Sequence, residues 1–159
     1  MQRARARVRT ARPSTMGQVV ELEIPARPDF LEVARMVVTT AASIEPTFPD
    51  ERINDLRLVV SEACTNAIEA HASSGDEDER ILLRCDLAED RVEVEVEDQG
   101  GGFDLADLGD LPAVTDPARL DHERGLGITL MREVADETEF RVSPEGTAVR
   151  LVVYSTKPR

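Results

Sequence analysis

The sequence predicts an α+β fold in which helices cover one face of a mixed, mostly antiparallel sheet, forming a two-layer α/β sandwich. The first observation is the order of the expected elements: a strand, two helices, two strands, a long loop, a helix and two strands. The second is that these segments have clear periods of either 3.6 or 2. The third is composition, because 159 residues of which 41% are hydrophobic suit one domain with a single core.

The N-terminal segment differs from the rest of the chain. Residues 1–16 contain five arginines, no acidic residue and no periodic apolar face. We expect a basic disordered tail here, followed by one domain over residues 17–156 and a short C-terminal tail at 157–159. Two alternatives stay open for this segment: Met16 is the true initiator, or the arginines form a basic arm for an acidic partner.

The first half of the domain is expected to hold a strand and two helices. Residues 19–24, VVELEI, alternate as a strand does. Asp29 is placed to cap a helix over residues 30–44, which prolines then end. The second helix begins at Asp50 and fades near residues 73–75, where Ser and Gly gather.

The second half is expected to be mostly strand. In the expected strand over residues 91–98, valines share one face and glutamates share the other, which indicates a half-buried antiparallel strand. A twenty-residue irregular loop follows, and such loops are often functional lids. The expected elements are strands 81–87 and 91–98, the loop 104–123, a helix over 125–136, and strands 138–142 and 146–154.

Charge and hydropathy exclude several classes of protein. The chain carries a net charge of −13, and because residues 1–16 carry +5, residues 17–159 carry −18. A body this acidic repels nucleic-acid phosphate, so we expect no direct binding of nucleic acid. No apolar run is long enough to span a membrane and none follows the basic start, so we expect a cytoplasmic protein without a signal peptide. Cys64 and Cys85 show no metal-ligand spacing and are interpreted as buried thiols.

Two polar residues interrupt the apolar face of the second helix, in the stretch SEACTNAIEAH. Glu62 and Asn66 are four residues apart, so their side chains project along nearly one line. An unpartnered buried carboxylate is costly. The pair therefore sits either at the edge of the core in water or facing a polar cavity.

The strand at 91–98 ends on a similar anomaly. Asp98 has the parity of Val92, Val94 and Val96, so it should point toward the helices. The glycines that follow, including Gly100 and Gly102, permit a close approach of the backbone to a ligand. A flexible turn is the simpler alternative, but the inward carboxylate favours a bound polar ligand.

The helix that begins near residue 124 offers a candidate phosphate site. Arg124, Gly125 and Gly127 combine a cation with glycines at a helix start, where backbone N–H groups and the helix dipole favour anions. A lone GxG is weak evidence and also fits an ordinary turn. The pair Gly146-Thr147 before the last strand is the weakest of these signals.

In this order, the motifs resemble those of the GHKL ATPases, which share the Bergerat ATP-binding fold. The pattern is ExxxN on a helix, DxGxG after a strand, a long loop, GxG on a helix and GT before a strand, and it covers nearly the whole chain. The segments SEACTNAIEAH and RGLGITLMREVAD are most similar to the corresponding segments of bacterial anti-sigma-factor serine/threonine kinases. The sequence shows no recognisable phospho-acceptor histidine helix, which argues against a sensor histidine kinase. The loop 104–123 is acidic rather than basic, so Arg124 is its one expected phosphate contact.

The resemblance implies a role for each candidate residue. It implies that Asn66 holds Mg²⁺ and that Glu62 is the catalytic base for the substrate hydroxyl. The remaining residues would bind ATP: Asp98 through the adenine amino group, Thr147 at the adenine end, Gly100 and Gly102 beside the nucleotide, and Arg124, Gly125 and Gly127 at the phosphates.

The resemblance also implies partners. The expected function is phosphorylation of an anti-anti-sigma protein on serine or threonine together with sequestration of a sigma factor, by a homodimer. One alternative is a nucleotide-binding sequestering module without significant kinase activity. Another is a stand-alone ATP-binding partner of a different signalling protein.

Overall fold

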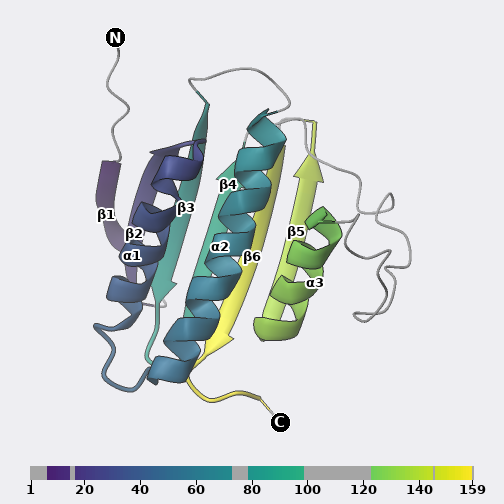
Figure 1. The fold of residues 1–159 in the computed structure, drawn as a ribbon. Coiled ribbons are helices and arrows are strands. Elements are labelled where there is room, and N and C mark those ends of the chain that lie inside the picture. Colours follow the sequence, from purple (N-terminus) through teal and green to yellow (C-terminus); the bar gives the residue numbers. More distant parts are fainter. Residues whose placement is uncertain (1–6, 15–16, 73–78, 99–122, 145, 159) are drawn as a thin grey trace.

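The three α-helices that the structure describes lie on one face of a single sheet (Figure 1). The computed structural model describes residues 7–14, 17–72, 79–98, 123–144 and 146–158, with the backbone alone at 7–14 and 123–125. The predicted two-layer α+β sandwich is confirmed. Among the described residues, no helix has both the length and the apolar character needed to cross a membrane.

The expected helices and strands are present, with boundaries close to those predicted. The elements are β1 (Arg7–Ser14), β2 (Gly17–Pro25), a short 3-10 helix (Pro28–Phe30), α1 (Leu31–Ala42), α2 (Asp50–Ala72), β3 (Arg80–Leu87), β4 (Arg91–Asp98), α3 (Glu123–Val134), β5 (Glu137–Ser143) and β6 (Gly146–Tyr154). Most of the predicted loop lies outside the described residues, and α3 begins at its last residue.

The sheet has the strand order β1-β2-β3-β4-β6-β5. Every neighbouring pair in this order is antiparallel, so the described sheet is antiparallel throughout rather than mixed. Because β6 comes between β4 and β5, the end of β4 lies beside the start of β6. This crossover brings together two segments almost fifty residues apart in sequence.

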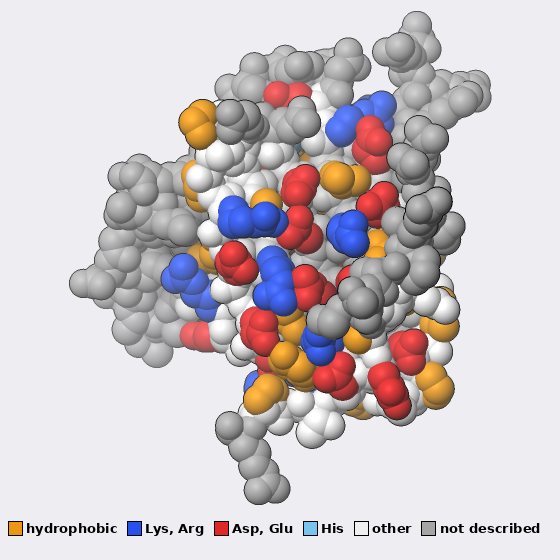
Figure 2. Space-filling view, turned by 180° about the vertical axis from the view of Figure 1, so that it is seen from behind, with side chains coloured by type: hydrophobic (Ala, Val, Ile, Leu, Met, Phe, Trp, Pro, Cys, Tyr) orange, Lys and Arg blue, Asp and Glu red, His pale blue; other side chains and the backbone are white. Residues whose placement is uncertain are grey.

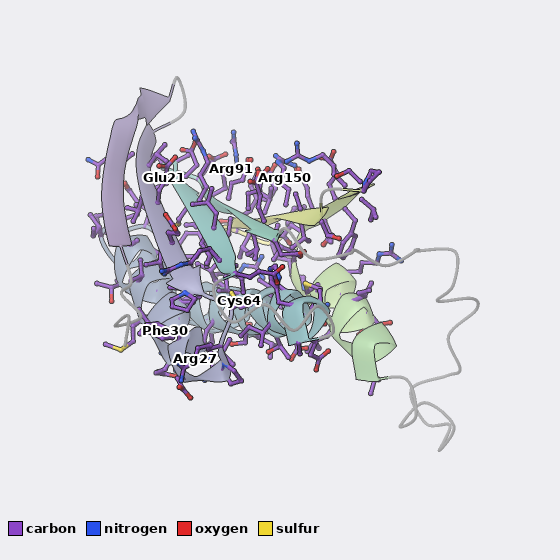
Figure 3. All side chains as sticks on the ribbon, turned by 90° about the horizontal axis from the view of Figure 1, so that it is seen from above. Glu21, Arg27, Phe30, Cys64, Arg91 and Arg150 are labelled. Carbon is purple, nitrogen blue, oxygen red and sulfur yellow. The ribbon has the colours of Figure 1, made fainter. Side chains whose placement is uncertain are left out.

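The core lies between the helices and the sheet. Val92, Val94 and Val96 are buried as their alternation predicted, while the glutamates between them are half-buried or exposed. Figure 3 shows Cys64 between the two layers, whereas Arg91 and Arg150 lie on the opposite face of the sheet. Aliphatic side chains fill most of this core, as a composition with 3% aromatics predicted.

The outer face of the sheet is covered by charged side chains of both signs (Figure 2). The guanidinium of Arg150 donates to both carboxylate oxygens of Glu93, at 2.7 and 2.8 Å. Arg84 lies 3.5 Å from Glu21 in the same layer. Ion pairs near the surface contribute little stability each, and these two keep this face of the sheet polar.

The predicted N-terminal tail is wrong over residues 7–14, which form strand β1 at the edge of the sheet. The register sets Arg7 opposite Glu23 and Arg9 opposite Glu21. Strand pairing is made by backbone hydrogen bonds, which need no apolar period in the sequence. The other residues of the predicted tail, 1–6 and 15–16, lie outside the described residues.

The predicted helix cap at Asp29 is also wrong. The residue that precedes α1 is Phe30, and it makes no capping hydrogen bond through its side chain. Asp29 lies instead within the 3-10 helix and accepts a hydrogen bond from Arg27 at 2.6 Å. The 3-10 turn shifts the start of α1 by one residue, so Phe30 rather than Asp29 occupies the capping position.

Candidate functional site

Helix α2 crosses the middle of the sheet and carries the first two candidate residues. Val59, Val60 and Ala63 are buried beneath the helix, while Glu62 and Asn66 are half-buried along one side of it. The side chains sit at the rim of the core, as their spacing predicted. That rim faces α3, which packs against α2.

Gly127 of α3 lies directly against this polar pair. A Cβ atom at Gly127 would come 2.8 Å from Oε2 of Glu62 and 3.4 Å from Oδ1 of Asn66. The carboxylate and the carboxamide therefore converge on one point of the first turns of α3. A side chain at position 127 would displace the carboxylate of Glu62, so glycine at this position leaves room for the carboxylate where it now lies.

The environment of Glu62 changes its acidity. Burial raises the pKa of its carboxyl group, and the negative charge of Glu69 on the same helix raises this pKa further. A carboxylate with a raised pKa accepts a proton more readily than an ordinary surface glutamate. This raised pKa is compatible with proton acceptance by Glu62.

Asp98 and Thr147 form the second half of the site. Asp98 ends β4, and Thr147, the second residue of β6, is its direct partner in the antiparallel register. Both belong to the faces that carry the buried residues of their strands, so both point toward the helices. Gly146, with φ +151°, has a backbone conformation that side chains disfavour, and it sets the path of the chain just before Thr147.

A pocket connects the two halves. Its polar residues are Asn66, Asp98 and Thr147, from three different elements. Thr147 is 8% exposed, and its Oγ1 has no hydrogen-bond partner among the described residues. A buried hydroxyl of this kind suits a polar ligand. The remaining lining is apolar and consists of Ala63, Ala67, Ala70, Val96, Met131, Phe140 and Val149.

These features fit a nucleotide with its cation. The pocket offers a polar end for the edge of a base and an apolar wall for its ring. The oxygen of Asn66 lies beside the carboxylate of Glu62, and Mg²⁺ needs only one or two such protein oxygens when phosphates and waters complete its shell. The residues present therefore suit ATP and Mg²⁺.

The remaining predicted residues are only partly described. Arg124 and Gly125 belong to the first turn of α3, where the backbone alone is described. Gly100 and Gly102 lie outside the described residues. The proposed phosphate contacts of these four residues stay predictions.

Sequence reasoning missed Phe140 and did not connect Met131 with the site. Phe140 shares one face of β5 with Thr138 and Val142, which indicated a strand but did not indicate that Phe140 would line the pocket. Aromatic residues are scarce in this chain, which contains only four phenylalanines and one tyrosine, and this scarcity could have directed attention to Phe140.

The two cysteines have no part in this site. Both are free and buried, as predicted. Burial raises the pKa of each thiol to about 12, so neither is ionised at neutral pH. A thiolate is the reactive form of cysteine, so these side chains serve packing rather than chemistry.

The fold and site together define an ATP-binding domain of the kind in which a helix and an antiparallel sheet enclose the nucleotide. A family model described as a histidine kinase-like ATPase domain matches residues 24–153. The chain belongs to this family and, within it, to the serine-protein kinases named RsbW. This confirms the family predicted from the motifs.

Three relatives illustrate the similarity. The chain is 34% identical to the serine-protein kinase RsbW of Bacillus pumilus over 145 residues, covering 89% of this chain and 88% of the relative. It is 37% identical to RsbW of Bacillus velezensis over the same length and the same shares. It is 36% identical to RsbW of Bacillus subtilis over 138 residues, or 85% of this chain and 84% of the relative.

Proposed function

We propose that this protein uses ATP to phosphorylate a serine of an anti-anti-sigma protein, and that it binds and sequesters a sigma factor. The observation that carries the catalytic part is the convergence of Glu62 and Asn66 on Gly127 of α3. A base and a metal-binding oxygen beside the first turns of α3, which include Arg124 and Gly125, are groups that phosphoryl transfer to a hydroxyl requires. The names of the relatives support the same activity.

Each residue would have a separate task. Asp98 and Thr147 would hold the polar edge of adenine, with Asp98 accepting from the amino group. The oxygen of Asn66 would bind Mg²⁺, which neutralises charge on the phosphates. The Glu62 carboxylate would orient the serine hydroxyl and accept its proton, and its raised pKa favours this step.

The catalytic part is tested with Glu62→Gln and Glu62→Ala. Both variants should bind ATP with nearly the affinity of the wild type and transfer no labelled phosphate to a candidate anti-anti-sigma protein. Asp98→Asn is the matched comparison, because it should lose binding as well. Transfer by Glu62→Ala at the rate of the wild type would rule out Glu62 as the base.

The alternative of a sequestering module without kinase activity has its own outcome in this experiment. Such a module would bind ATP and a sigma factor but would label no partner even in the wild type. A protein that retains Glu62 in the observed position beside Asn66 is better suited to transfer than to binding alone.

The acidic charge of the domain supports an electrostatic contribution to partner binding. With −18 over residues 17–159, the domain would attract basic segments of a sigma factor. Affinity for that partner should fall as salt is raised, and salt-independent binding would contradict this contribution. We also propose that the protein is cytoplasmic and forms a homodimer. Sedimentation of the purified protein would test the dimer.

A further inference from the structure

The pocket has an aromatic wall that the predicted site residues do not include. Phe140 of β5 lines it together with Met131 of α3 and Val149 of β6. Phe140 and Val149 are direct partners in the register of β5 and β6. Thr147 is two residues before Val149, so the aromatic wall and the buried hydroxyl belong to one continuous surface.

The ring of Phe140 is held from a second side. The guanidinium carbon of Arg132, in the last turn of α3, lies 5.6 Å from the centroid of the ring, which is within the range of a cation–π contact. The hydroxyl of Thr138 donates to the carbonyl oxygen of Met131 at 3.3 Å. These two contacts fix β5 against α3 and hold the ring at the pocket.

We propose that Phe140 contacts the purine ring of the bound nucleotide and sets its affinity, with Arg132 as a positioning residue for the ring. The inference rests on the proposed function, because it assumes that the base occupies the pocket between Asp98 and Phe140. A purine has a polar edge and flat apolar faces, and the pocket provides a matching polar end and aromatic wall. Aromatic side chains are well suited to contact the face of a base.

The simpler alternative is that Phe140 only fills the space between β5 and α3. A leucine would serve that purpose nearly as well, since swaps between apolar side chains of similar volume are tolerated in cores. The two interpretations therefore differ in the effect of Phe140→Leu and Phe140→Ala on nucleotide binding, not in their effect on folding.

The first experiment measures the affinity for ATP and for adenosine by calorimetry. Phe140→Ala should weaken both by about tenfold, because the lost contact is with the base and not with the phosphates. Phe140→Leu should weaken both by less, and Phe140→Tyr should keep most of the affinity. Phe30→Leu is the matched control, because it removes a partly buried ring on the far side of the core and should leave binding unchanged.

Arg132 is tested in the same assay. Arg132→Ala should lower the affinity for ATP and for adenosine by one common factor, and this factor should be smaller than that for Phe140→Ala. Arg132→Lys keeps a cation over the ring and should therefore retain most of the wild-type affinity. Equal weakening by both variants would contradict a cation–π role for Arg132.

A fluorescence experiment gives a readout that is independent of affinity. The chain contains no tryptophan, so Phe140→Trp introduces a single reporter at the pocket. Saturating ADP should change its emission, whereas a reporter at Phe30→Trp should not respond. If the wild type binds ATP but Phe140→Ala binds it with equal affinity, the role of Phe140 is contradicted and the proposed function is not. The same holds if the emission of Phe140→Trp does not respond to ADP. Folded wild type that binds no nucleotide overturns the proposed function.

Discussion

Asp98 and Thr147 are direct partners across β4 and β6, and they place a carboxylate and a buried hydroxyl side by side facing the helices. Oγ1 of Thr147 is buried without a hydrogen-bond partner among the described residues, which is unfavourable in an apolar core. Their juxtaposition identifies the polar end of the pocket. Substitutions at this end of the pocket can therefore distinguish its contribution to ligand binding from its contribution to folding.

Thr147→Val should affect binding and stability in opposite directions. The substitution keeps the shape of the side chain and removes a hydroxyl that has no partner among the described residues. The free energy of unfolding without ligand should stay the same or rise by up to about 1 kcal/mol. ATP affinity should fall, as measured by calorimetry beside urea unfolding. A large loss of stability would show that the hydroxyl has a structural partner.

The raised pKa of Glu62 should appear in the pH dependence of stability. Burial and Glu69 raise this pKa in the folded protein above the ordinary value of 4.5. The folded state therefore binds a proton more readily than the unfolded chain. The resulting stability is fully present below the unfolded pKa and is lost as pH rises through the folded pKa.

Glu62→Gln, which is neutral at every pH, should accordingly melt above the wild type at pH 7. The two melting temperatures should converge as pH falls toward 4, measured without nucleotide or metal. A constant difference between Glu62→Gln and wild type across this range would contradict the raised pKa. In the kinase assay, phosphate transfer by the wild type should fall as acid protonates Glu62.

Gly127→Ala should impair phosphate transfer without unfolding the protein. Alanine is favoured over glycine in a helix by about 1 kcal/mol, which offsets the strain of moving a flexible side-chain end. The added Cβ would come 2.8 Å from Oε2 of Glu62, so the carboxylate must move away from its present position. Thermal melting should change by only a few degrees while the rate of transfer falls at least tenfold. An unchanged rate would show that the position of Glu62 relative to α3 is unimportant.

Arg52 should be the most sensitive ion-pair residue of the described chain. Its guanidinium pairs with Asp55 and Asp136 and donates to the carbonyl oxygen of Tyr154 at 2.8 Å. The side chains of Arg52 and Asp136 are only 6% and 4% exposed. This cluster joins the start of α2 to the end of β6 and to the turn between α3 and β5.

Arg52→Leu should lower the free energy of unfolding by about 3 kcal/mol, because Asp136 would remain buried without its cation. Arg27→Ala removes a surface arginine that pairs with exposed Asp29, and should cost less than about 1 kcal/mol. Urea unfolding of the two variants measures this contrast. Similar small losses in both would mean that the Arg52 cluster contributes no more than a surface pair.

The sequence by itself determined the local features of this protein. Alternation placed Val92, Val94 and Val96 inward and gave Asp98 the same direction, because side chains of a strand alternate between its two faces. Helical spacing placed Glu62 and Asn66 on one line for a similarly local reason. The ATPase family followed from the order of these motifs along the chain.

Only the tertiary structure decided which distant residues meet. The crossover that inserts β6 between β4 and β5 sets Thr147 opposite Asp98 and brings Phe140 to the same pocket. Pairing with β2 likewise turns Arg7–Ser14 from an expected tail into an edge strand. Strand order, register and the packing of α3 on Glu62 depend on contacts between segments far apart in sequence, and neither the period of a segment nor its composition specifies them.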